Sequence, residues 1–350
     1  MPYGDVLEPA QLAPPTLPAA RGPWSEWLFD RLTGAPGAVG PAPAVTTSVI
    51  RDADLALALY CLYELHYRGF AGVDDAWEWE PELLAARRLL EQRFEAELRE
   101  VVTGPELTEL PGALYEVIKE GSAPSVSRFL AQHGTAEQFR EFAVHRSAYQ
   151  LKEADPHTWA LPRLGGAPKA AMVEIQADEY GAGIERDMHQ NLFAVTMAEL
   201  GLDPSYNGYL DRLPAETLTT VNLVSFFGLH RRLRGAVVGH LALFEMTSVE
   251  PMGLCAEALR RLGYGPGARH FYEVHVVADA HHETVAAEQL AAGLAELEPD
   301  LVPDIVFGAR AVMYVEGLLS ALMVSAWKRG RSSLRENSGE RGLVRLRSAG

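Results

Sequence analysis

Cysteine and positive charge are both scarce in this sequence. Its 350 residues include two cysteines, Cys61 and Cys255, which lie far apart and have no partner at CxxC spacing. We therefore expect neither a disulfide framework nor a thiolate metal site. Asp and Glu number 47 against 31 Lys and Arg, and the formal charge of −16 argues against a nucleic-acid partner, because phosphate binding needs clustered basic residues.

Targeting and membrane signals are also missing from the pattern. The N-terminus lacks a basic segment followed by an apolar run, so no signal peptide is predicted. No apolar stretch is expected to be long enough to span a bilayer. These absences predict a cytoplasmic protein without a membrane partner. Basic residues concentrate only in the Ser/Gly-rich segment 331–350, which we interpret as a flexible tail rather than a binding arm.

Strand alternation, hairpin turn pairs and βαβ rhythm are absent as well, whereas apolar residues recur at helical spacing. The sequence therefore predicts an all-α fold. We divide it into a Pro/Ala/Gly-rich N-terminal arm (1–50) with one short helix near its tryptophans, accessory helices (51–135), a helical bundle (136–330) and the basic tail. Helices are predicted at 52–63, 81–102, 125–132, 135–152, 170–180, 184–200, 256–262, 270–297 and 304–329, and the range 214–248 holds further helical pattern.

The most informative stretch carries His275, Asp279 and His282 at i, i+4 and i+7. On an α-helix these positions return to one face within two turns. Two imidazoles and a carboxylate on one face form a mixed nitrogen and oxygen ligand set of the kind that suits iron or manganese. The alternative is a solvated helix that happens to contain histidines.

Glu245 ends an otherwise apolar run that begins at Gly235. Its carboxylate is therefore expected on a partly buried face, where it must be paired, protonated or metal-bound. The non-metal interpretation is a buried salt bridge to Arg231 or Arg232.

Glu179 and His189 flank a glycine break at 181–183. Ten residues of regular helix leave the two side chains roughly 80° apart around the axis, so they converge only if the glycines bend the chain. The neighbouring Glu174 and Asp178 are alternative carboxylates, although neither shares the helix face of Glu179 well.

Three carboxylates and three imidazoles in apolar helices fit two adjacent irons in a helical bundle, with carboxylates able to bridge the metals. They are Glu179, His189, Glu245, His275, Asp279 and His282. A ferritin-like carboxylate site would need two Glu-x-x-His motifs, and the sequence has none. We therefore expect a different arrangement of helices around the metals.

The order of these residues resembles the heme-oxygenase-like di-iron oxidases and oxygenases, often described as iron-containing redox enzymes. That family places a Glu and a His around one core helix, then a later Glu, then a His-x-x-x-Asp-x-x-His helix. The resemblance covers roughly residues 50–330. The spacing of the ligand residues is most similar to that in the central domain of the nitrosourea-forming N-oxygenase. An additional Glu ligand of that protein would correspond to Glu153, which rests on the resemblance alone.

The resemblance implies a heme-oxygenase-like bundle that holds two Fe(II)/Fe(III) ions and uses O2 as co-substrate in secondary metabolism. It implies amine N-oxygenation, C–H oxidation or C–C cleavage of a small organic substrate through a peroxo-diferric intermediate. Electrons would come from an external reductant, since no Gly-x-Gly-x-x-Gly fingerprint follows a strand. The N-oxygenase continues into a cupin domain, which we expect this chain to lack, together with that domain's rearranging activity.

Two other functions stay open at this point. The chain could be a non-catalytic metal-binding or scaffold protein, or it could bind heme through one axial histidine, which a Soret band on adding heme would reveal. Oligomeric state is open, with a homodimer as the commonest default. His281 is expected to be exposed or to support a ligand. Tyr149 and Tyr180 are interpreted as packing residues, with lining of the cavity as the alternative. The remaining histidines are interpreted as structural or surface residues: His66, His133, His145, His157, His230, His240 and His270.

Overall fold

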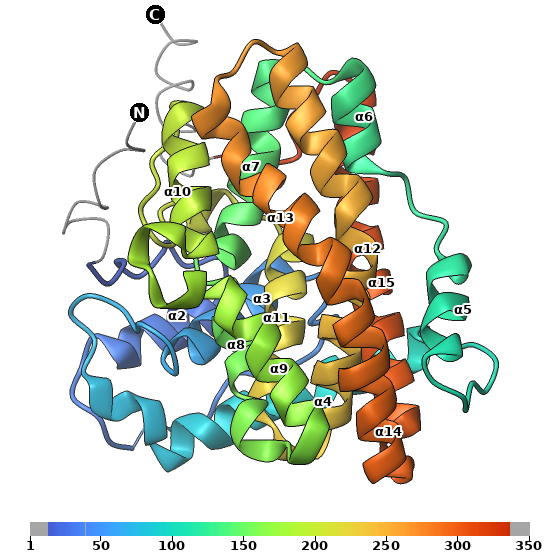
Figure 1. Cartoon of the computed structure of the whole chain (residues 1–350). Coiled ribbons are helices and arrows are strands. Elements are labelled where there is room, and N and C mark those ends of the chain that lie inside the picture. The colour runs from blue at the N-terminus through green and yellow to red at the C-terminus, as the bar shows by residue number, and fades with distance from the viewer. Residues whose placement is uncertain (1–12, 39, 337–350) are drawn as a thin grey trace, which may run out of the picture.

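The computed structural model describes residues 13–38 and 40–336, and these residues form a helical bundle without a strand (Figure 1). The all-α prediction is therefore confirmed. Most of the basic tail lies outside the described residues. Its first part is docked on the bundle, since Ser333 is buried and Arg335 donates its backbone N–H to the carbonyl oxygen of Arg212.

The bundle is built from α-helices joined mainly by short turns. In chain order they are α2 (Pro23–Leu32), α3 (Ala53–Glu64), α4 (Pro81–Val101), α5 (Gly112–Glu120), α6 (Val126–His133), α7 (Ala136–Gln150), α8 (Asp155–Thr158), α9 (Gly166–Glu179), α10 (His189–Glu199), α11 (Ala215–Leu229), α12 (Arg234–Arg261), α13 (Pro266–Thr284), α14 (Gly293–Leu297) and α15 (Val302–Lys328).

The short N-terminal helix α2 is part of the core rather than a surface arm. Trp24, Trp27 and Leu28 are buried against α3. The Asp54 carboxylate of α3 accepts hydrogen bonds from the backbone N–H groups of Trp24 and Ser25, both at 2.8 Å. Because the first N–H groups of a helix have no partner within the helix, this carboxylate caps α2 and fixes it to the bundle.

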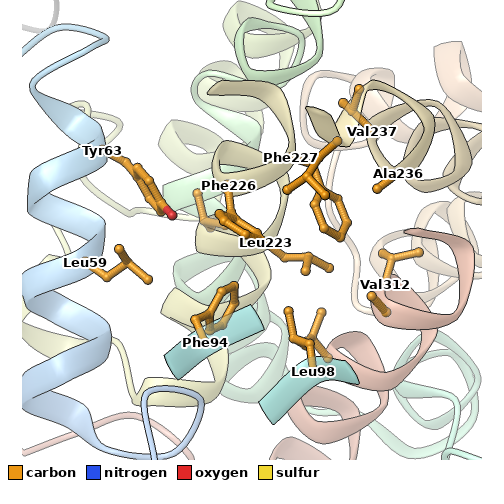
Figure 2. Packing of buried hydrophobic residues seen from close by; sticks show 14 of the residues in the cluster. Leu59, Tyr63, Phe94, Leu98, Leu223, Phe226, Phe227, Ala236, Val237 and Val312 are labelled. Carbon is orange, nitrogen blue, oxygen red and sulfur yellow. The ribbon is translucent and has the colours of Figure 1, made fainter. Parts of the chain in front are cut away.

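The main apolar core lies where α3, α4, α11, α12 and α15 meet, as Figure 2 shows. Helix α11 is buried nearly all round and stands at the centre of this packing. Phe226 packs edge to face on Phe94 of α4 at 5.8 Å between ring centroids, and Phe227 packs in the same way on Phe307 of α15. This core holds the N-terminal helices against the half of the bundle that carries the predicted ligands.

Helix α12 is longer than the sequence predicted, because it runs without interruption through Pro251 into the segment expected to be a separate helix at 256–262. Pro251 is exposed. A proline removes one backbone hydrogen bond and usually ends or kinks a helix. Here α12 packs extensively along α13 and α15, and this packing continues the helix past the break.

Helix α13 leads directly into a π-helical stretch, Val285–Ala292, and then into α14. The three segments form one helical run that matches the predicted helix at 270–297. Figure 1 shows this run crossing the front of the bundle beside α12. The π-helical stretch begins three residues after His282, and such local changes of helix period are frequent at functional sites.

The predicted glycine break separates α9 from α10 as expected, but α10 begins only at His189 rather than at residue 184. Gly181 and Gly183 have φ angles of 60° and 82°, which favour glycine. A Cβ on Gly181 would lie 2.5 Å from the carbonyl carbon of Asp187. The chain therefore folds back on itself over a few residues, and a side chain at Gly181 would prevent it.

One described helix, spanning Pro299–Lys328, is long and apolar enough to cross a membrane by length and composition. The expectation that no stretch reaches this length was therefore wrong. Half of its most apolar window is buried inside the molecule, and α15 packs on α11 and α12. Length and composition are weak grounds for a membrane span, because a buried core helix has the same properties.

Helices α12 and α15 cross with their backbones in direct contact at two glycines. A Cβ on Gly239 would collide with the carbonyl oxygen of Ile305, and one on Gly308 with the carbonyl oxygen of Ala236. We predict that Gly239→Ala or Gly308→Ala lowers the free energy of unfolding by on the order of 1–3 kcal/mol, as overpacking does. Urea unfolding followed by circular dichroism would measure the loss.

Gly253→Ala, on the same helix α12, is the matched control. The nearest atom to a Cβ there is a methyl carbon of Val276 at 3.8 Å, which is ordinary contact. This variant should keep or raise stability by up to about 1 kcal/mol, because alanine favours helix. Equal losses in the variants at Gly239 and Gly253 would contradict the close crossing.

Candidate metal centre

The structure buries all seven residues that the sequence analysis singled out and brings them to one place between α7, α9, α10, α12 and α13. Glu179 is the last residue of α9, and His189 is the first residue of α10, on either side of the glycine break. The exposed fraction is at most 8% for each of the seven, which are Glu153, Glu179, His189, Glu245, His275, Asp279 and His282.

Four of these residues form a first group that we call position A: Glu153, Glu179, His189 and His275. Each offers one ligand atom, and these four atoms lie within 4.8 Å of one another. The Nδ1 atom of His189 is 2.9 Å from Oε2 of Glu179, and Nε2 of His275 is 3.5 Å from Oε1 of Glu153. Two carboxylates and two imidazoles therefore converge on one point.

A second group, which we call position B, contains Glu179, Asp279 and His282, again with ligand atoms within 4.8 Å of one another. Glu245 is not part of either compact group. It lies beside position B, with its Oε2 atom 3.5 Å from Nδ1 of His282. Glu179 belongs to both positions, so its carboxylate stands between them.

Five polar atoms of the two positions are buried without a hydrogen-bond partner. They are Oε2 of Glu153, Oε2 of Glu179, Nδ1 of His189, Oδ1 of Asp279 and Nδ1 of His282. Oε2 of Glu179 and Nδ1 of His189 are 2.9 Å apart, but both atoms count as unpaired because their contact does not have hydrogen-bond geometry. Buried polar atoms are normally paired, at a cost of about 1–3 kcal/mol each when they are not. Imidazole nitrogens and carboxylate oxygens that converge in this way are suitable ligands for divalent cations such as iron.

The charges of the cluster depend on protons when no metal is bound. Burial opposes a charge on His275, but Glu153 outweighs it and raises the His275 pKa to about 10. Burial likewise opposes a charge on His282, and Asp279 and Glu245 raise its pKa to about 11. Burial, aided by the Asp279 carboxylate, raises the pKa of Glu245 to about 7. Protonated imidazoles thus balance the carboxylates in the metal-free protein.

Neighbouring groups fix which nitrogen of each α13 imidazole faces the centre. Nε2 of His282 lies 3.0 Å from Oδ2 of Asp178, so Nε2–H donates to that carboxylate and Nδ1 faces position B. Nδ1 of His275 lies 2.8 Å from the carbonyl oxygen of Phe271, so Nδ1–H donates there and Nε2 faces position A. Such partners orient metal-binding histidines and increase their basicity.

Asp178 and Ser248 contact residues of the candidate site in a way that the sequence analysis did not predict. Asp178 was considered only as an alternative ligand, and the structure places it against the opposite nitrogen of His282. The Ser248 hydroxyl donates to Oδ2 of Asp279 at 2.5 Å. The only available signal was position in sequence: Asp178 adjoins Glu179, and Ser248 follows Glu245 by one helical turn.

Among the described residues, no ion pair joins Glu245 to Arg231 or Arg232, so the salt-bridge alternative is not realised; Glu245 contacts His282, and Arg232 forms two hydrogen bonds with Glu95 at 2.9 and 2.5 Å. His281 is exposed and contacts Glu174 at 2.8 Å, as expected for a residue outside the centre. The hydroxyl of Tyr180 donates a hydrogen bond to the carboxylate of Asp155, which is not one of the predicted ligands.

A cavity of about 270 Å³ adjoins the cluster. Its lining includes Glu153, Glu179, His275 and Asp279, together with Glu245. Much of its wall is apolar and includes Tyr149 stacked on Phe244, with ring centroids 5.7 Å apart, and the side chains of Leu241, Leu243, Val312 and Met313. A small organic molecule in this cavity would contact the metal-binding atoms directly.

Comparison with known proteins matches the central part of the chain. A family model described as an iron-containing redox enzyme matches residues 140–317, about half of the chain, and this range includes all seven buried residues. A nitrosourea synthase from Streptomyces achromogenes subsp. streptozoticus is 26% identical over 159 residues. That match covers 45% of this chain and 34% of the relative, so the similarity spans about a third of the relative's length.

We predict that Asp178→Asn weakens metal binding at position B by about 10–100-fold, as the loss of a partner that orients a ligand usually does. Isothermal titration with Mn(II) under anaerobic conditions would measure this. Glu174→Gln is the matched control, because Glu174 also lies on α9 and reaches a histidine of α13, but that histidine is the exposed His281. Equal affinities in the two variants would contradict the orienting role of Asp178.

The raised histidine pKa values predict opposite pH trends for stability and for metal affinity. Because the pKa of His275 is about 10, well above its ordinary value of about 6.5, its proton stabilises the metal-free protein below pH ~6.5, and this stabilisation is lost as the pH rises toward 10. His282, with a pKa of about 11, has the same sign. Metal must displace these protons, so affinity should rise over that range.

Thermal unfolding of the EDTA-treated protein should therefore show a falling midpoint from pH 6.5 to 10. Titration calorimetry of a divalent metal at pH 7, repeated in buffers of different ionisation enthalpy, should show protons released on binding. Metal binding that releases no protons would refute the exchange of protons for metal.

Proposed function

The chain belongs to the iron-containing redox enzyme family, and on that premise we propose that it is a non-heme di-iron oxidase or oxygenase. It would use O2 to oxidise a small organic substrate bound in the cavity. The observation that supports two metals rather than one is Glu179, whose carboxylate belongs to both position A and position B. Carboxylates are the usual bridging ligands between two adjacent metal ions.

Position A would hold its iron with Glu153, Glu179, His189 and His275, and position B with Glu179, Asp279 and His282. Glu245 would complete position B once it has lost its proton, which its pKa of about 7 permits near neutral pH. This mixture of imidazole and carboxylate ligands suits iron or manganese, whereas copper and zinc often bind at sites with thiolate ligands. With Glu245 included, each position would have four protein ligands, and this would leave coordination sites open for O2 or substrate.

Ferrous iron bound by these residues would supply electrons to O2 for oxidation of the substrate. The chain's own residues hold and orient the reactants. Asp178 and Phe271 orient the imidazole rings, and the stacked pair Tyr149 and Phe244 gives the cavity an apolar wall. The similarity to a nitrosourea synthase keeps amine N-oxygenation among the proposed reactions, beside C–H oxidation and C–C cleavage.

An external electron donor would be required to return both irons to the ferrous state. No nicotinamide or flavin fingerprint occurs in the sequence to supply electrons from within the chain.

We predict that the metal-free protein binds about two Fe(II) ions per chain under anaerobic conditions, one for each position. His189→Ala should remove binding at position A and His282→Ala at position B, so each variant keeps about one ion. Glu179→Ala should weaken both, because its carboxylate serves both positions. Equilibrium dialysis with a colorimetric iron assay would give the stoichiometry.

His281→Ala is the control, since His281 adjoins His282 in sequence but is exposed. The iron-loaded protein should then consume O2 in a rapid-mixing experiment, and the variants at His189 and His282 should not. If the chain binds no iron, or binds it equally well without these imidazoles, the proposal fails and a scaffold role becomes the better interpretation. A Soret band on adding heme would favour the heme alternative instead.

A further inference from the structure

The cavity contains an ion pair that takes no part in the metal positions. Arg146 of α7 donates two hydrogen bonds to the carboxylate of Glu316 of α15, at 2.9 and 2.7 Å. Both residues line the cavity, and their side chains keep 18% and 19% of their surface exposed. The pair is therefore shielded from bulk water and still open to a molecule in the cavity.

Two buried polar groups of the same cavity have no hydrogen-bond partner. Oε1 of Gln150 and the hydroxyl of Tyr272 are both unpaired, and the two residues are 6% and 1% exposed. Gln150 follows Arg146 by one turn of α7 and so lies on the same helix face. Tyr272 lies near the Arg146 guanidinium. Unpaired buried polar groups beside a cavity indicate a polar ligand.

The polar groups and the metal positions stand apart in the same cavity. Arg146 precedes Glu153 by seven residues, which is two helical turns or about 10 Å along the axis if the turn after α7 keeps helical rise. Apolar side chains, among them Tyr149, Phe244 and Met313, line the cavity as well. The cavity thus offers a polar site for a head group, apolar side chains and the metal-binding residues to one ligand.

We propose that this cavity binds a small zwitterion, a molecule that carries a carboxylate and an ammonium group as an α-amino acid does. Its carboxylate contacts Arg146 and its ammonium contacts Glu316 and Oε1 of Gln150, while its apolar chain extends toward the metal centre. The reaction at the far end of that chain rests on the proposed function, whereas the binding does not.

The opposite charges of the pair are what select a zwitterion. A bare carboxylate would face the Glu316 carboxylate, and a bare amine would face the Arg146 guanidinium. Either ligand would leave a partly buried charge without compensation, which is costly. A zwitterion satisfies both charges at once and also gives the unpaired acceptor of Gln150 a donor.

Three probes with the same six-carbon chain test the proposal on the metal-free full-length protein by isothermal titration calorimetry. They are L-norleucine, hexanoate and hexylamine. Norleucine should bind at least about tenfold more tightly than either singly charged probe, since an uncompensated buried charge costs more than 1.4 kcal/mol. The comparison needs no variant and so does not depend on the folding of one.

Two substitutions then separate the roles of the charges. Glu316→Gln should weaken the binding of norleucine and strengthen the binding of hexanoate, because it removes the carboxylate that repels hexanoate and keeps Arg146. Arg146→Gln should weaken both norleucine and hexanoate and strengthen hexylamine. Arg232→Gln and Glu95→Gln are the matched controls, because they break a similar two-bond ion pair outside the cavity, and they should leave all three affinities unchanged.

Equal binding of the three probes, or binding of none, would overturn the proposal. So would variants at Arg146 and Glu316 that lower stability while leaving the order of the three affinities unchanged, since the pair would then only hold α7 to α15. Iron binding with no preference for norleucine would leave the di-iron function standing and remove this inference. If the protein bound norleucine with this preference but took up no iron, this inference would stand and the di-iron function would fail.

Discussion

The burial of four carboxylates within one small volume is the constraint on which the rest of this structure depends. Glu153, Glu179, Glu245 and Asp279 lie in an apolar bundle where a single unpaired charge is costly. The chain meets this cost with three imidazoles and, without metal, with the protons that they hold. That balance leaves buried lone pairs without a hydrogen-bond partner, and divalent cations bound there would satisfy them. The bundle must therefore be rigid enough to hold this arrangement together.

The rigidity comes from packing at some distance from the centre. Gly239 and Gly308 let α12 and α15 cross with their backbones in contact, and this crossing sets the position of α12, which carries Glu245. Helix α12 in turn packs along α13, which carries three more of the predicted ligands. At the other side, Gly181 lets the chain fold back so that Glu179 and His189 meet. Small residues at a few backbone contacts thus determine the geometry of the centre.

How much could be predicted from the sequence depended on the range of each interaction. His275 and His282 lie on a single regular helix, so their spacing was sufficient to place them on one face. The meeting of Glu179 with a residue of the next helix required a turn that the glycines permit but whose path they do not specify. The contact of Asp178 with His282 joins two helices 104 positions apart, and no local pattern predicts it. The continuation of α12 through Pro251 likewise came from packing that overrides local propensity.

One helix joins the metal centre to the selection of substrate. On α7 and the turn after it, Arg146, Gln150 and Glu153 follow one another at spacings of four and three residues, so all three lie on one face. The distance from head group to metal is then set by helical rise rather than by the packing of separate elements. Glu316, whose charge is opposite to that of Arg146, lies on α15, and this helix contributes no predicted metal ligand. A substitution at Glu316 can therefore change which substrate binds without disturbing the metal positions, and this separates specificity from chemistry within one cavity.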